Sequence, residues 1–267
     1  DRGHGLGIAP MIMAGSTAPV TMAGAMVLVV AEVLASNFMV MALTGEPSNY
    51  FGHGSHSNDP RTMLCSFGAP NQALLAIASA QMGRFYGIDA GSNSALSDAL
   101  MPDFQCGFEK AFSALYGALA GTVSIGCQGI TGADQGFSFE QLVIDDEWLD
   151  ACNYVAGGIE VNEETIAEEL IHEVGIGGNF LGEEHTAKHL RRNFWPSRLF
   201  DRYDFDRWKQ LGATELLDRA SALVDRLTDG YRDAAPVLDP AKCGALDRIA
   251  RAGYRKILGA DSPYVAR

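Results

Sequence analysis

Residues 10–43 read PMIMAGSTAPVTMAGAMVLVVAEVLASNFMVMAL, and this stretch decides the fold class. A short apolar run over residues 10–14 is followed by the polar turn Gly15-Ser16-Thr17. Pro19 comes next and suits the first turn of a helix, with a hydroxyl side chain as its N-cap. The apolar residues beyond it predict a long helix over residues 21–43. The unit is therefore a strand, a loop and a helix.

The same unit recurs three times before residue 155. The further strand and helix pairs are expected at residues 49–51 and 70–82, at residues 85–88 and from Asp103 onward, and at residues 122–127 and from Ser138 onward. Ser138 and Gln141 have the spacing of a capping box. Strands that alternate with helices predict parallel pairing through right-handed crossovers. Four such units are half of an eight-stranded barrel, and an open four-stranded sheet is the alternative that spacing leaves open.

The second half of the chain predicts helices without strands. The expected helices cover residues 162–174, 184–193, 201–211, 214–229 and 240–258. The predicted organisation is therefore residues 1–155 as four βα units of a TIM-type barrel and residues 156–267 as a helical C-terminal region packed on it. The fold class is α/β.

Charge and cysteine content limit the possible partners. The net charge of -13 argues against a nucleic-acid partner, which would require clustered basic side chains. The five cysteines form no C-x-x-C pair, and no signal peptide precedes the first glycines, so a reducing cytoplasm is expected. The chain begins at Asp1 without an initiator Met, which suggests a piece of something longer.

The apolar stretch over residues 22–43 is long enough to span a bilayer. Glu32 and Asn37 lie inside it, and no basic residue occurs between Arg2 and Arg61. Because a spanning helix usually has basic residues on one flank, a helix buried in the protein is the preferred interpretation. No membrane contact is expected.

The histidines lack the spacing of a metal site. His53 and His56 have no evident third ligand nearby, and zinc needs three or four protein ligands. His185 and His189 are four residues apart, but their segment lacks the glutamate of an H-E-x-x-H motif. No catalytic metal is therefore expected.

Ordered blocks along nearly the whole chain resemble one known family. Residues 13–25 (MAGSTAPVTMAGA) and 102–110 (PDFQCGFEK) are similar to the Met-Ala-Gly-x-x-x-Pro-Val-Thr-x-Ala-Gly and Pro-Asp-x-Gln-x-Gly-x-Glu segments of the trimethylamine methyltransferase family. Residues 138–147 and 174–182 resemble two further blocks of it. The resemblance implies a (β/α)8 barrel of which this chain is the C-terminal half, the missing portion lying on the N-terminal side.

The resemblance also implies an activity and a partner. Family enzymes move a methyl group from a methylated amine to the cobalt of a small corrinoid protein, so the cobalamin would be carried by the partner and not bound by this chain alone. Archaeal trimethylamine enzymes of the family use pyrrolysine, and this sequence contains standard amino acids only. Glycine betaine, a quaternary amine, is therefore the first expected substrate and trimethylamine the second.

Loops at the C-terminal ends of the strands are where a parallel barrel holds its chemistry. A quaternary ammonium group needs an aromatic face and carboxylates around it, since nothing can hydrogen-bond to it. The candidate substrate-binding residues near the strand ends are Tyr50, His53, Asp98, Asp103, Gln105 and Gln128. The simpler interpretation is that such residues only cap helices and form turns.

Other functions stay open at this point. A different barrel enzyme, such as a lyase or isomerase with Asp98 or Asp103 as base, fits the same pattern. A truncated fragment or a cation-binding module without turnover also fits it. An isolated half barrel would expose sheet edges and apolar surface, which a second copy of the chain could cover.

Overall fold

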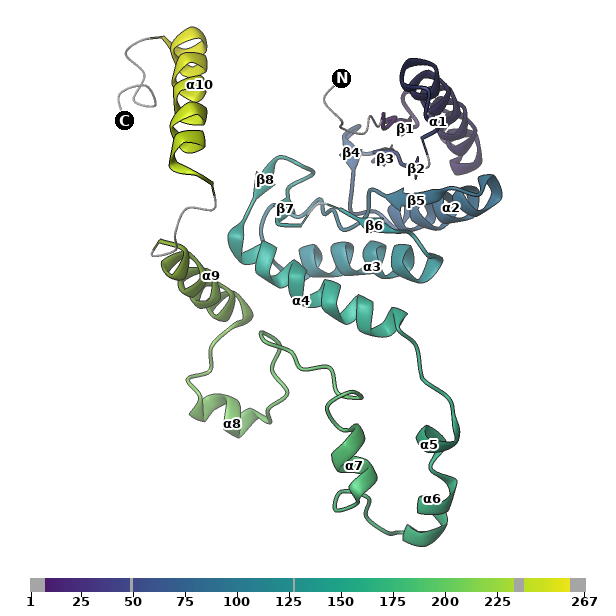
Figure 1. Cartoon of the computed structure of the whole chain (residues 1–267), viewed down its shortest axis with the longest axis vertical. Coiled ribbons are helices and arrows are strands. Elements are labelled where there is room, and N and C mark those ends of the chain that lie inside the picture. Colours follow the sequence, from purple (N-terminus) through teal and green to yellow (C-terminus); the bar gives the residue numbers. More distant parts are fainter. Residues whose placement is uncertain (1–7, 49, 127, 233–237, 260–267) are drawn as a thin grey trace. The chain divides into compact units, whose positions relative to one another are not determined.

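The computed structural model describes residues 8–48, 50–126, 128–232 and 238–259. The chain divides into two compact units, Asp1–Val224 and Asp225–Arg267, and each is described by itself. Figure 1 shows the order of the helices and strands along the chain.

The first unit begins with alternating strands and helices. In chain order these are β1 (Met13–Ala14), α1 (Met22–Thr44), β2 (Tyr50–Phe51), β3 (His56–Asn58), β4 (Cys65–Ser66), α2 (Asn71–Tyr86), β5 (Asp89–Ser92), α3 (Phe104–Ala120), β6 (Ser124–Ile125), β7 (Ile130–Thr131), β8 (Gly136–Phe137) and α4 (Phe139–Ala156). Cys127 and Asn49, which the sequence assigned to strands, lie outside the described residues.

The successive strands of the predicted units pair in parallel, as the alternation predicts. β1 pairs with β3 through Met13 opposite His56, and β2 pairs with β5 through Tyr50 opposite Asp89. β5 in turn pairs with β6. β2 and β3 both belong to the extended segment 50–58 and together form the second predicted strand. The predicted strands therefore lie side by side in their order along the chain: β1, then the segment of β2 and β3, then β5 and then β6. Within the described residues they form small open sheets and close no barrel.

Two antiparallel hairpins were not predicted. β3 pairs with β4 inside the connection that follows the second strand, and β7 pairs with β8 inside the connection that follows the fourth. The expectation of purely parallel pairing over residues 10–130 is therefore wrong at β3–β4. Neither hairpin joins the strands of two successive units, so the βα order is unaffected.

An apolar cluster joins α1 to the strands. Val29 and Val33 of α1 are almost fully buried, and they pack with Ile12, Phe51 and Ala90 of the strand segments. Among the described residues, α1 is the one helix long and apolar enough to cross a membrane, a test that the core helix of a soluble protein also passes. The expectation of no membrane contact stays a prediction.

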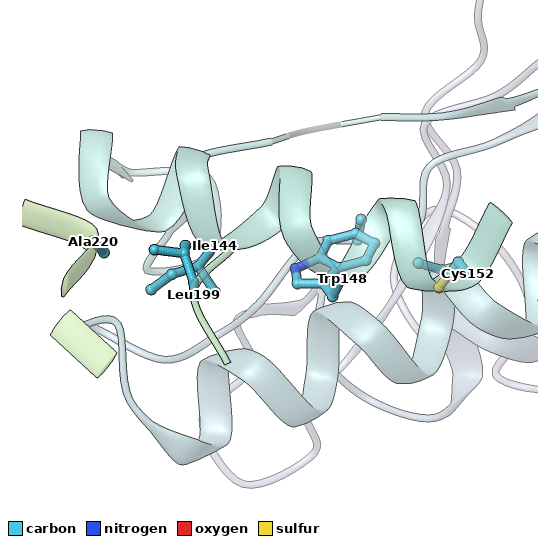
Figure 2. Close-up of a cluster of buried hydrophobic side chains, with 7 residues drawn as sticks. Ile144, Trp148, Cys152, Leu199 and Ala220 are labelled. Atoms are coloured by element: carbon cyan, nitrogen blue, oxygen red, sulfur yellow. The ribbon is translucent and has the colours of Figure 1, made fainter. Parts of the chain in front are cut away.

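A second cluster joins α3 and α4 to the chain that follows them. Ile144, Trp148 and Cys152 lie along one side of α4 and pack with Leu199 and Ala220 (Figure 2). Ala95 and Ala114 complete the buried set. Residues near positions 199 and 220 are thereby attached to the αβ layer, since burying apolar side chains is the main favourable contribution to folding.

The described part of the second half is helical, as predicted, and its helices before residue 211 are shorter than predicted. It contains α5 (Glu163–Ile166), α6 (Glu168–Val174), α7 (Glu184–His189), α8 (Phe205–Gln210), α9 (Leu216–Arg232) and α10 (Pro240–Leu258). The single helix expected over residues 162–174 is broken at Ala167, whose φ of 52° is left-handed. Asn162 does cap α5, as predicted, by accepting from the Thr165 backbone amide.

One strand was predicted too early. Residues 85–88 were expected to be a strand, but α2 continues through Tyr86 and ends at Gly87, whose φ of 69° is left-handed. The strand begins at Asp89 instead. Aromatic residues favour strands in general, and here the packing of α2 on β5 overrides that preference.

Gly83 provides a test of this helix–strand packing. A Cβ at Gly83 would lie 2.7 Å from the Cβ of Ala90 and 2.8 Å from the Ile88 carbonyl oxygen. Gly83→Ala should therefore lower the free energy of unfolding by about 1–3 kcal/mol, because α2 must move away from β5. Gly107→Ala is the matched control, since nothing lies within 4 Å of its added Cβ, and it should stabilise α3 by about 0.5–1 kcal/mol. Urea unfolding measures both, and equal effects would contradict the packing argument.

Candidate functional site

A cavity of about 820 Å³ lies among the segments that follow β3, β5 and β6. Its wall comes from residues 59–70, 98–109 and 131–136. These are the connections in which the sequence placed the site, at the C-terminal ends of parallel strands. Three stretches that are distant in sequence thus form one wall.

Asp98 is the polar centre of one side of this cavity. Its carboxylate accepts a hydrogen bond from the Ser66 hydroxyl at 2.7 Å, from the Phe67 amide at 2.7 Å and from the Gly68 amide at 3.1 Å. The carboxylate therefore holds the connection between β4 and α2 in place.

Glu109 of α3 lies on the same wall and was not among the sequence candidates. Its carboxylate accepts from the Ser97 hydroxyl at 2.7 Å, from the Asp98 amide at 2.9 Å and from the Gln105 side chain at 2.8 Å. A Cβ at Gly68 would overlap this carboxylate, so glycine there permits the close approach. The spacing of Gln105 and Glu109, one helical turn apart, is the signal that could have identified Glu109.

The cavity wall is negatively charged where these two groups meet. Within the described part of the chain, neither Asp98 nor Glu109 forms an ion pair with Lys or Arg. Burial, and then the charge of Asp98, raise the pKa of the neighbouring Cys65 thiol. Burial lowers the pKa of His56, and the charges of Asp134 and Asp98 oppose that change. A cation would be attracted to this wall, since carboxylates without a countercharge favour it.

An aromatic face and one guanidinium complete the wall. The Phe108 ring lines the cavity and stacks on Phe112 at 5.3 Å between ring centroids. Arg61 also lines the cavity, with its guanidinium 3.0 Å from the Asp59 carboxylate. The cavity thus contains an aromatic ring, carboxylates and one positive group.

The structure brings together two of the six sequence candidates. Asp98 and Gln105 both line the cavity. Asp103 instead caps α3 by accepting from the Cys106 amide at 3.0 Å, and it borders a different, more apolar cavity. Gln128 donates to the Ile125 carbonyl at 3.3 Å and does not line the main cavity.

Tyr50 lies on the strands and not on the cavity wall. Its hydroxyl is 2.7 Å from the Ser124 hydroxyl of β6. A Cβ at Gly52 or Gly91 would overlap the tyrosine side chain, so these glycines make room for the ring to cross from β2 to β6. The ring therefore ties neighbouring strands together.

His53 is buried between its strand segment and α2. Nδ1 accepts from the Ser55 amide at 3.2 Å, so the neutral ring carries its proton on Nε2 and donates to the Ser79 hydroxyl at 2.6 Å. Ser79 in turn donates to the Leu75 carbonyl at 2.7 Å. Both nitrogens are occupied by the protein itself, and the chain of bonds fixes one tautomer.

Two histidines of the second half, His185 and His189, lie beside one glutamate. The His189 ring is 3.1 Å from the Glu164 carboxylate, which also pairs with Lys188, and the His185 ring bonds the Glu164 backbone carbonyl at 3.0 Å. Among the residues that the structure describes, no three His, Cys, Asp or Glu side chains are grouped so that they could hold a metal ion. The expectation of no catalytic metal stays a prediction.

Comparison with known proteins identifies the family of the chain. The family model for trimethylamine methyltransferase (MTTB) matches residues 1–253. The chain belongs to this family. The chain is 33% identical over 241 residues to a glycine betaine methyltransferase of Desulfitobacterium hafniense (strain Y51), covering 90% of this chain and 50% of the relative. It is 34% identical over 229 residues to the trimethylamine methyltransferase MttB1 of Methanosarcina acetivorans, covering 85% of this chain and 45% of the relative.

The chain therefore spans about half the length of the curated relatives it matches. The family resemblance that the sequence blocks carried is confirmed along almost the whole chain. The identities to the two relatives are nearly equal, so overall similarity does not separate their substrates.

Burial of His53 predicts a dependence of stability on pH. Burial, and next the charge of His56, lower the pKa of His53 from 6.5 to about 4. Between these values the unfolded chain binds a proton that the folded chain does not, so the stabilising contribution is complete above pH 6.5 and is lost as the pH falls toward 4. The loss should be on the order of 3 kcal/mol.

Urea unfolding between about pH 7 and about pH 4.5 measures this contribution, a window set by the two pKa values. His53→Gln should show a flatter dependence than the unmodified chain. His172→Gln is the control, because the His172 side chain is 79% exposed, and it should keep the full dependence. Equal slopes for the unmodified chain and His53→Gln would contradict the prediction.

Proposed function

We propose that this chain forms the C-terminal half of the barrel of a cytoplasmic methyltransferase that moves a methyl group from a quaternary amine to a corrinoid protein. Glycine betaine is the first proposed substrate and trimethylamine the second. The observation that carries the proposal is a pair of carboxylates, Asp98 and Glu109, neither of which forms an ion pair with Lys or Arg among the described residues, in a cavity at the C-terminal ends of parallel strands. Family membership supplies the reaction class.

Open strand edges support a half barrel. Among the described strands, β1 pairs with β3 alone and β6 pairs with β5 alone. Proteins avoid exposed edges of this kind, and relatives about twice as long have the residues for four further strands. In a complete barrel, this cavity wall would form one side of the site at the C-terminal ends of the strands.

The residues of this chain would bind and orient the amine. Asp98 and Glu109 would attract its cationic nitrogen, and the Phe108 ring would offer an aromatic face to the methyl groups. A quaternary nitrogen already leaves as a neutral amine with the electron pair of the broken C–N bond, so the chain need not supply a general acid. The corrinoid, when bound, supplies the Co(I) nucleophile.

Arg61 favours glycine betaine over trimethylamine. Glycine betaine carries a carboxylate as well as a quaternary nitrogen, and the cavity wall contains the Arg61 guanidinium as well as the carboxylates of Asp59, Asp98 and Glu109. The Arg61 side chain is 86% exposed beside Asp59, so it can turn toward a ligand. Guanidinium groups bind carboxylates in paired geometry. Trimethylamine has no group that would use Arg61.

Glu109→Gln should weaken the binding of glycine betaine roughly tenfold, since it removes one negative charge from a partly desolvated wall. Isothermal titration measures the change. The carbon analogue 3,3-dimethylbutanoate has the same shape without the positive charge, and its binding should not weaken. Glu168→Gln is the matched control, because the Glu168 side chain is 80% exposed and does not line this cavity. Equal losses for the charged and uncharged ligands would contradict a cation site.

Arg61→Gln should weaken glycine betaine roughly tenfold and leave tetramethylammonium unchanged, because only the first ligand has a carboxylate for the guanidinium. Isothermal titration measures the affinity for both ligands. A loss for tetramethylammonium as well would assign Arg61 to the general shape of the cavity and remove the argument for glycine betaine.

Turnover tests the reaction itself. The full-length protein that contains this chain is mixed with reduced cobalamin and each amine in turn, and formation of methylcobalamin is followed by absorbance. Turnover of glycine betaine is expected. Turnover of trimethylamine but of no quaternary amine would reject the proposed substrate. Binding of the amine without any turnover would favour a cation-binding module, the second candidate, which the half-length match to the relatives keeps open.

A further inference from the structure

A fully buried ion pair lies between α3 and α4, away from the cavity surface. The Lys110 ammonium of α3 is 3.1 Å from the Asp145 carboxylate of α4, and both side chains are 0% exposed. Neither residue lines the cavity. Lysine and aspartate are seldom buried completely unless they are paired, so this position requires an explanation.

Each member of the pair also forms a hydrogen bond with the start of the β7–β8 hairpin. Lys110 donates to the Ile130 carbonyl at 2.7 Å, and the Gly129 amide donates to Asp145 at 2.7 Å. The second oxygen of Asp145 accepts from the Gln141 side chain at 2.5 Å and from the Trp148 indole at 2.8 Å. Two adjacent backbone groups are thus attached to two helices at once.

The far end of that hairpin is cavity wall. Residues 131–133 and 135–136 line the cavity. The Gly132 amide donates to the Ala99 carbonyl at 2.7 Å and the Ala133 amide to the Ser97 carbonyl at 2.9 Å, on either side of Asp98. Ala133 and Asp134 have left-handed φ values of 53° and 69°, a strained backbone that persists only when its surroundings hold it.

Stability alone does not explain the pair. Removing two charges from water costs about as much as their attraction returns, and apolar replacements of buried pairs are often neutral or stabilising. Burial raises the pKa of the Asp145 carboxyl, while Lys110 and the Gly129 amide favour its charged form. Two apolar side chains in place of Lys110 and Asp145 could not form hydrogen bonds with the backbone of Gly129 and Ile130.

We propose that Lys110 and Asp145 are positioning residues that hold the hairpin of residues 129–137 as a wall of the cavity. The pair fixes the base of the hairpin on α3 and α4, so that its tip meets the Asp98 loop. The effect on substrate rests on the proposed function, whereas the effect on the hairpin does not.

The double variant Lys110→Met with Asp145→Asn removes both charges and keeps an oxygen for Gln141 and Trp148. Hydrogen exchange followed by mass spectrometry should show the hairpin peptide exchanging at least roughly tenfold faster, while peptides from α3 and α4 keep their protection. The double variant Glu147→Gln with Arg198→Met is the matched control. It removes another ion pair of α4, which bonds residues 197–199 and not the hairpin, so it should leave hairpin exchange unchanged.

Unchanged hairpin exchange in the folded Lys110→Met, Asp145→Asn variant would overturn the proposal. If that variant fails to fold, the unmodified chain gives the answer in low concentrations of urea. There the Gly129 amide should become exchangeable only together with the α3 and α4 amides, and earlier exchange of Gly129 would overturn the proposal.

A titration with glycine betaine separates the two proposals. If the hairpin loosens and glycine betaine binds roughly tenfold more weakly, both are supported. If the hairpin loosens and the unmodified protein does not bind the ligand, the positioning role stands and the proposed function fails.

Discussion

Helix α3 has to place two neighbouring side chains of opposite charge in opposite surroundings. Glu109 reaches the cavity, where its carboxylate bonds the Asp98 amide, while Lys110 enters the interior and meets Asp145. Successive residues of a helix point about 100° apart, so both contacts are satisfied at one rotation of α3 about its axis. A different rotation would leave a buried ammonium without its partner, which is strongly unfavourable. The orientation of α3 therefore couples the buried interior to the cavity wall.

Glycines permit the close approaches on which this arrangement depends. Gly68 admits the Glu109 carboxylate to the start of α2, and Gly83 lets α2 lie against β5. Gly52 and Gly91 leave space for the Tyr50 ring across three strands. A side chain at any of these positions would push apart two elements that the cavity needs together. The glycine positions are thus part of the construction of the site and not only of its turns.

The alternation of strands and helices could be predicted from the sequence because it depends on local periodicity. Helix α10 was predicted to the residue, and the Ser138 cap of α4 is present. Its Gln141 partner, however, turns into the interior toward Asp145, because a buried carboxylate competes with the capping contact. The strands of the two hairpins are too short to show a period, and the buried Lys110 depends on a contact with Asp145 of another helix, which periodicity does not report.

The candidate site was predicted as a location more accurately than as a set of residues. Asp98 and Gln105 were found because they follow strand ends. Tyr50 and His53 follow the same rule, yet the extended segment continues beyond them to β3, so they lie within a strand region and face its neighbours. Glu109 was not predicted because it lies more than one turn into α3, farther from the loop than Gln105. A rule about strand ends does not identify a helical residue that contacts the backbone of the preceding loop.

The apolar character of α1 has the same origin as the open edges of the sheets. One side of α1 packs on the strands through Val29 and Val33, while Val27 and Phe38 on other sides are 67% and 65% exposed. A helix that is apolar all round is stable where it has apolar neighbours on more than one side. β1, the strand that precedes α1, is also one of the strands that lie at the edge of a sheet among the described residues. In the proposed barrel both features face the portion that the longer relatives possess, so one missing neighbour accounts for an uncovered helix and an unpaired strand together.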